Sequence, residues 1–97
     1  MAVTELLAEQ AAAGARYSAA VAELRAAWIG LAAIERALGN AHVAGRSVPT
    51  FHGDTPDLPP SRLLHPRFAP DVGARWSDEA DRRRDEIVHS FTRGAAA

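Results

Sequence analysis

The chain of 97 residues has no cysteine and no lysine, and its six prolines all lie between positions 49 and 70. Without cysteine there can be no disulfide bond, no thiolate metal site and no cysteine nucleophile. The eleven basic residues are therefore all arginine, and together with twelve acidic residues they leave a formal net charge of −1. This balance provides no overall electrostatic attraction to nucleic acid or to an anionic membrane.

Long uninterrupted apolar runs are also missing. The amino terminus has no basic segment followed by an apolar run, so no signal peptide is expected. Charged residues (Glu23, Arg25, Glu35 and Arg36) interrupt the apolar stretch 21–38. A membrane span needs about 20 predominantly apolar residues, so no span is expected and the chain is predicted to be cytoplasmic or part of a virion.

The position of the prolines divides the chain into three parts. The pattern predicts a mainly α protein, with a long N-terminal helix over residues 4–38 and a short C-terminal helix over 77–93. An extended proline-rich arm over 39–75 joins them, with little or no sheet beyond a possible short strand at 48–51. A length of 97 residues allows one small domain, so the three parts are treated as a single unit.

Cap residues set the expected helix ends. Thr4 and Ser77 are suitable N-caps, because their hydroxyl groups can accept a bond from a free helical N–H. Gly39-Asn40 and Gly94 are expected to end the two helices, because glycine readily adopts the left-handed backbone found there.

The first helix carries a seam of apolar residues at alternating spacings of four and three, as in a coiled coil. Its members are Tyr17, Val21, Leu24, Trp28, Leu31 and Leu38, with Glu35 breaking one position. Ile34, Ala27 and Ala20 flank the seam and widen the apolar arc, which predicts packing against more than one neighbour.

The arm and the second helix supply further apolar anchors. A compact domain rarely contains so long a segment without secondary structure, so the arm is expected to lie along a neighbouring subunit. The expected anchors are Leu58, Leu63, Leu64 and Phe68 in the arm, and Trp76, Ile87 and Phe91 in the second helix.

Residue types that bind metals gather in the arm, at His52, Asp54, Asp57 and His65. Their spacing matches no established metal motif, and turn residues of this kind commonly cap turns. No metal or other cofactor is therefore expected.

Two pairs have residue types used in catalysis, Ser61 with His65 and Asp85 with His89. No nucleophile elbow or oxyanion hole accompanies either pair, so the chain is predicted not to be an enzyme.

The one basic cluster is Arg82-Arg83-Arg84. Arginines on a helix can contact phosphates, but five acidic residues surround this cluster between positions 78 and 86. A helix that reads DNA normally has a net positive face, so nucleic-acid binding is not expected.

The tripeptide Trp28-Ile29-Gly30 resembles the W-x-G motif of the small WXG proteins exported by type VII secretion systems. The resemblance implies a dimeric helical hairpin with the motif at its turn. The seam instead runs through this tripeptide, and thus predicts an unbroken helix there.

These features predict a structural subunit of a larger assembly, with other protein subunits as partners in a homo- or hetero-oligomer. A minor virion protein of a tailed phage, acting in connection, cementing or tail assembly, is the most specific expectation, and it rests on architecture alone. The alternatives are the secreted helical dimer and an antitoxin-like regulatory binder whose arm folds on its partner.

Overall fold

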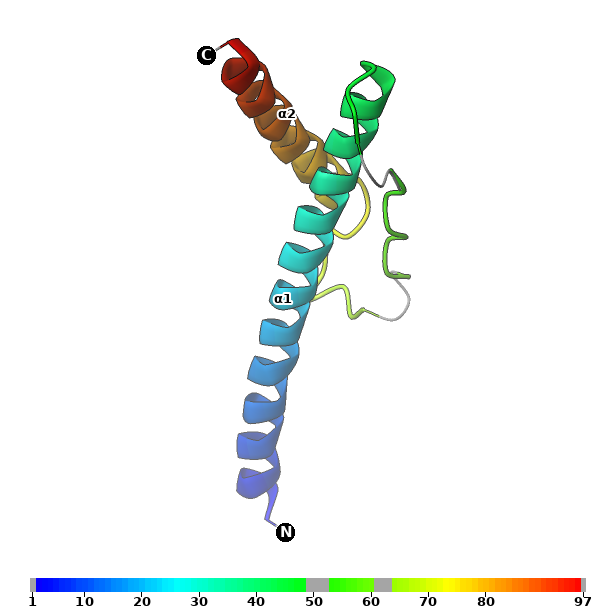
Figure 1. Ribbon diagram of the computed structural model, residues 1–97. Coiled ribbons are helices and arrows are strands. Elements are labelled where there is room, and N and C mark those ends of the chain that lie inside the picture. The colour runs from blue at the N-terminus through cyan, green and yellow to red at the C-terminus, as the bar shows by residue number, and fades with distance from the viewer. Residues whose placement is uncertain (1, 49–52, 61–63, 97) are drawn as a thin grey trace.

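The computed structural model describes residues 2–48, 53–60 and 64–96, with side chains described as far as Ser90. Within these ranges the chain forms two helices, α1 (Val3–Val43) and α2 (Ala74–Ala96), and no strand (Figure 1). The predicted mainly α class is therefore confirmed. Of the possible strand at 48–51, Val48 has no regular structure and the other residues lie outside the described ranges.

The predicted C-terminal end of the first helix was wrong, as was the Thr4 cap, although the predicted start lies one residue from the observed one. Thr4 lies inside the first turn, since α1 begins at Val3 after Ala2, which makes no side-chain cap. At the other end the helix continues through Gly39-Asn40 and stops before Gly45, whose φ is +78°. The N–H of Arg46 donates to the carbonyl of Ala41 at 3.0 Å, which satisfies one of the terminal carbonyl groups.

The predicted ends of the second helix were also wrong. It begins at Ala74, directly after Gly73 with φ +111°, and continues past Gly94 to Ala96. Ser77 is therefore inside the first turn and is not an N-cap. Its side chain instead accepts a hydrogen bond from Arg36 of α1 at 3.0 Å.

A small core forms where the two helices cross. It contains Trp28, Ile29 and Ala32 of α1 and Trp76 and Ala80 of α2, all buried. The two indole rings lie 6.3 Å apart, within the range in which aromatic pairs attract. The alanines lack bulky side chains and so let the helices approach closely at the crossing.

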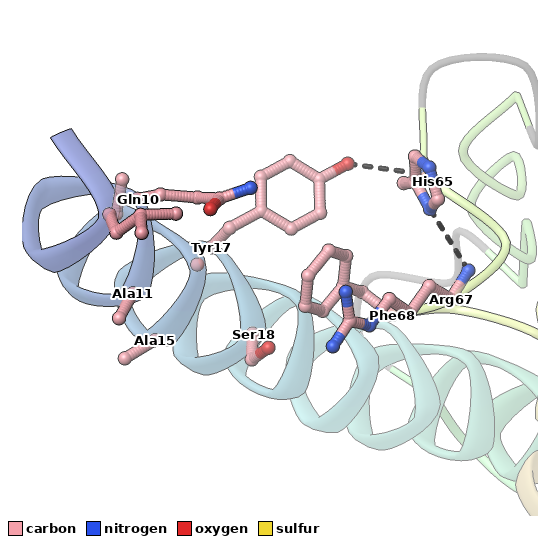
Figure 2. A pocket seen from close by; sticks show the side chains of 11 residues that line it. Gln10, Ala11, Ala15, Tyr17, Ser18, His65, Arg67 and Phe68 are labelled. Atoms are coloured by element: carbon pink, nitrogen blue, oxygen red, sulfur yellow. Dashed lines mark hydrogen bonds between the residues drawn. The ribbon is translucent and has the colours of Figure 1, made fainter. Parts of the chain in front are cut away.

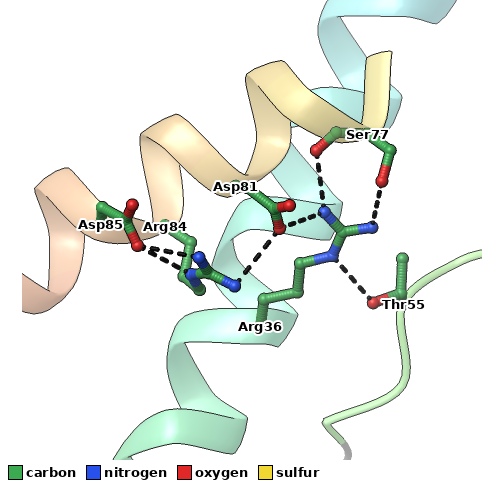
Figure 3. Close-up of polar contacts among 6 residues, drawn as sticks. All are labelled: Arg36, Thr55, Ser77, Asp81, Arg84 and Asp85. Atoms are coloured by element: carbon green, nitrogen blue, oxygen red, sulfur yellow. Dashed lines mark hydrogen bonds and ion pairs between the residues drawn. The ribbon is translucent and has the colours of Figure 1, made fainter. Parts of the chain in front are cut away.

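Arg36 adds a polar clamp beside this core (Figure 3). Its guanidinium donates to the backbone carbonyl of Ser77 at 2.9 Å and to the Asp81 carboxylate at 2.6 Å. It also donates to the Thr55 hydroxyl at 3.2 Å, so one side chain joins α1, α2 and the arm.

The arm runs beside its own α1 (Figure 1). The indole N–H of Trp28 donates to the carbonyls of Pro56 and Asp57, each at 3.1 Å. Further along, the backbone N–H of His65 donates to the Tyr17 hydroxyl at 3.0 Å. These bonds hold the arm within the chain, and its placement on a neighbouring subunit stays a prediction.

The molecule is elongated, measuring 65 × 27 × 22 Å with a radius of gyration of 18.7 Å. A compact domain of about 100 residues has a radius of gyration of about 13 Å. The excess comes from α1, which is unbroken through Gly30 and would measure about 62 Å at about 1.5 Å per residue. The hairpin turn implied by the W-x-G resemblance is therefore absent.

Candidate protein interface

Helix α1 has two apolar faces. Its inner face supplies the buried residues Val21, Trp28, Ile29, Ala32, Ala33 and Ala37, which lie under the arm and α2. At about 100° per residue, a second row of apolar side chains runs beside this face, because Leu24 and Leu31 lie about 40° and 60° around the helix from the buried Trp28. Figure 1 shows that the N-terminal half of α1 projects away from the rest of the molecule.

We call this second row the outer stripe. It comprises Val3, Leu6, Ala13, Tyr17, Ala20, Leu24, Ala27, Leu31, Ile34 and Leu38, with Gln10 in the one polar position. All of these apolar residues are exposed except Leu38, which is half-buried. Val3 is 71% exposed, Leu31 49% and Ile34 52%, so large apolar side chains face solvent along nearly all of α1.

The outer stripe differs from the predicted seam. The seam combined residues of both faces, because Val21 and Trp28 point into the core whereas Leu24 and Leu31 point outward. The positions of the outer stripe are separated by three and four residues in turn from Val3 to Leu38, and this spacing is the sequence signal that could have identified the stripe. The sequence does not show which of two apolar rows on a helix is buried, because this depends on where the arm and α2 pack.

The other predicted interface residues occupy different environments. Trp76 is buried in the core, Leu64, Phe68 and Ile87 are half-buried, and Leu58 is 36% exposed. Leu63 and the side chain of Phe91 lie outside the described residues. The described Leu64 packs against the core cluster, so its first partner is within the chain.

An open cavity of about 990 Å³ lies beside the N-terminal half of the outer stripe (Figure 2). Leu7, Gln10 and Gly14 line it from α1, and the ring of Phe68 lies 4.9 Å from that of Tyr17. The lining is mainly aliphatic and aromatic, so it extends the apolar surface around the stripe.

The titratable groups of the arm form no metal-ligand cluster among the residues that the structure describes. His65 uses its Nδ1 to accept a hydrogen bond from the backbone N–H of Arg67 at 3.1 Å. His52 and Ser61 lie outside the described ranges.

The arginine cluster of α2 is paired with carboxylates of its own helix. Arg82 contacts Glu79 and Glu86, Arg83 contacts Glu79, and Arg84 contacts Asp85 at 2.9 Å. The hydrogen bond from Arg82 lowers the pKa of Glu79 to about 2 and, in return, Glu79 raises the pKa of Arg82. These partners neutralise the positive charge of the cluster locally.

Asp71 links the arm to both helices. The Trp76 indole N–H donates to one of its oxygens at 3.1 Å, and Arg25 donates to the other at 3.4 Å. The bond from Trp76 is the main reason that the pKa of Asp71 lies below its usual value, and Arg25 adds to the effect. The charged form of Asp71 therefore holds the end of the arm beside α2.

Length and composition make α1 a candidate membrane span, contrary to the expectation from its interrupting charges. The core helix of a soluble protein or a signal sequence can also be long and apolar enough to qualify, and α1 lies near the N-terminus. The outer stripe must therefore be tested against lipid as well as against protein.

Comparison of the chain with protein-family models, with curated proteins and with solved structures found no match.

Proposed function

We propose that this protein is a non-enzymatic assembly subunit that binds a helix of another protein chain along the outer stripe of α1. The observation that supports this most directly is the exposure of large apolar side chains at coiled-coil spacing over nearly the whole helix. Large contiguous apolar patches on a soluble protein mark interaction sites.

The energetics favour a partner on this surface. Full burial of one leucine side chain is worth about 1.5–3 kcal/mol, and the outer stripe leaves Leu6, Leu24 and Leu31 in solvent. The first five turns of α1 also receive little cover from the rest of the chain, and short isolated helices are only marginally stable in water. A partner helix would bury these side chains and stabilise the N-terminal half.

The setting we propose is a minor protein of a tailed phage or phage-like particle, as a connector, cement or tail-assembly component. This setting rests on the helix-plus-arm architecture. Mass spectrometry of purified particles from the source organism tests it, and absence of the chain from such particles would remove this setting while leaving the binding role intact.

A photo-crosslinking amino acid placed at Leu24 tests the binding role in cells that express the full chain. Leu24 lies on the outer stripe and is 39% exposed. Ala26 is the matched control, because it is an exposed position of the same helix away from the outer stripe. We expect discrete protein adducts from Leu24 and none from Ala26.

Adducts of the chain with itself or with another protein both support the assembly role. Equal labelling from the two positions, or no protein adduct from Leu24, would contradict it.

A further inference from the structure

The proposed binding role leaves the partner open, and the following inference rests on that role. We propose that the partner is a second copy of this chain, paired antiparallel along the outer stripe with the two-fold axis beside residues 18 and 19. In this register Val3–Ile34 of one copy lies against Ile34–Val3 of the other, a length of about 47 Å at about 1.5 Å per residue.

The side chains of the outer stripe fit themselves in this register. In antiparallel helix pairs, the two alternating positions of an apolar row face each other, so Leu24 meets Ala13 of the other copy. The part of Tyr17 that Phe68 leaves exposed, 38% of the residue, meets Ala20 of the other copy. Large residues thus face small ones near the axis, so their side chains fill the space between the two helices without overcrowding. Toward the ends Leu6 faces Leu31, and the single polar residue, Gln10, faces a small alanine.

Charges beside the stripe select the same register. Arg16 and Glu23 are exposed on its flank, and neither forms an ion pair among the described residues of the single chain. They are seven residues apart, too far for a pair within one helix. In the proposed dimer, Arg16 lies beside Glu23 of the other copy, and the two-fold axis repeats this attraction.

Neighbouring registers lack this complementarity. Shifting the axis by half a heptad toward the C-terminus places Glu23 beside Glu23 of the other copy. The opposite shift places Arg16 beside Arg16. A parallel pair puts Arg16 beside Val21 and Glu23 beside Trp28, which supplies no ion pair. Of these arrangements, only the axis at residues 18 and 19 pairs opposite charges, and like-charge contacts would disfavour both shifts.

A lipid surface fits the outer stripe less well. A spanning helix would carry the unpaired Arg16 and Glu23 into or near the apolar layer, where charged side chains are costly. A second copy instead neutralises both groups. Binding to phospholipid vesicles is therefore an outcome that the experiment must separate from dimerisation.

Because the chain contains no cysteine, disulfide trapping reads the register directly. The full chain is made as three single variants, Ala13→Cys, Leu24→Cys and Leu31→Cys, and the variants are co-refolded in pairs in a thiol–disulfide buffer. We expect Ala13→Cys to join Leu24→Cys in the mixture, because these positions face each other across the dimer and a disulfide needs Cα atoms about 4.4–6.8 Å apart.

The mixture of Ala13→Cys with Leu31→Cys is the register control, because these positions face each other only when the axis is shifted by half a heptad. A dominant disulfide in this mixture would overturn the proposed register. A disulfide between two copies of the Ala13→Cys variant, together with one between two copies of the Leu24→Cys variant, would indicate a parallel pair and overturn the antiparallel arrangement.

Charge reversal provides an independent measurement on the cysteine-free chain. We expect Arg16→Glu to raise the dimer dissociation constant about tenfold at low salt, and less at high salt, because it places two acidic groups together on each side of the axis. The double variant Arg16→Glu, Glu23→Arg restores the pair with the charges exchanged and should return the dissociation constant toward that of the unaltered chain. No recovery would contradict the pairing.

Light scattering behind a sizing column measures the molar mass of the chain in solution. It therefore tests the homodimer separately from the binding role. A 10.3 kDa monomer at all concentrations overturns the homodimer. If crosslinks from Leu24 still join the chain to another protein, the binding role stands. If the monomer binds phosphatidylcholine–phosphatidylglycerol vesicles and Leu24 labels no protein, both proposals are overturned.

Discussion

At the scale of single residues, Arg36 contributes most to joining the parts of the chain. Its side chain is 19% exposed and bonds to Ser77 and Asp81 of α2 and Thr55 of the arm, while its guanidinium lies 5.9 Å from the Trp28 ring centre. In the sequence Arg36 is only one of the charges that interrupt the apolar stretch 21–38, and nothing local to it indicates the distant acceptors.

We expect Arg36→Met to lower the free energy of unfolding by about 2 kcal/mol, because the acceptors on α2 lose a charged donor while the aliphatic bulk is kept. Urea denaturation at fixed protein concentration measures this change. Arg25→Met is the control: its side chain is 40% exposed and makes one contact with Asp71 at 3.4 Å, so its loss should cost about 0.5 kcal/mol or less. Equal effects of the two substitutions would contradict the clamp.

At the scale of elements, the glycines decide where α1 continues and where it ends. Gly30 is helical, whereas Gly45 has φ +78°, yet a Cβ atom at either position would meet nothing within 4 Å. A difference in the free energy of unfolding between alanine variants at the two sites would therefore result from backbone conformation and not from steric crowding.

We expect Gly30→Ala to raise the free energy of unfolding by about 0.5–1 kcal/mol, because alanine favours the helix and narrows the unfolded ensemble. Gly45→Ala should lower it by about 1 kcal/mol, because the left-handed backbone is strained for a residue with a Cβ atom. The stabilities of the two variants are compared by thermal and urea denaturation, with circular dichroism as the signal. Destabilisation by Gly30→Ala would instead favour the turn implied by the W-x-G resemblance.

At the scale of the whole molecule, stability is divided unevenly along α1. All the buried residues of α1 lie within 21–37, where the arm and α2 cover one side of the helix, whereas most of residues 3–20 have no cover from the chain itself. The elongated shape follows from this division, because half of the long helix extends beyond the core.

Hydrogen exchange should reveal this division. We expect amides of residues 5–16 to exchange at least about tenfold more slowly in the assembled protein than in the dilute monomer, because partner burial suppresses local opening. Amides of residues 25–37 serve as the internal control and should be protected in both states. Similar exchange of residues 5–16 at all concentrations and with all partners would contradict an interface on the outer stripe.

The helical class, the division by prolines and the absence of cysteine chemistry follow from the amino-acid sequence alone. Local periodicity and the restrictions of proline are sufficient for these features. The helix ends were missed because backbone conformation at Gly39 and Gly45 depends on what surrounds them, and glycine suits both a helix and its termination. Which apolar row of α1 faces inward depends on tertiary packing, because Val21 and Leu24 are both apolar and differ in burial only once the arm and α2 cover one side of the helix. The outer stripe is thus a property of the folded chain, defined by what the rest of the molecule leaves exposed.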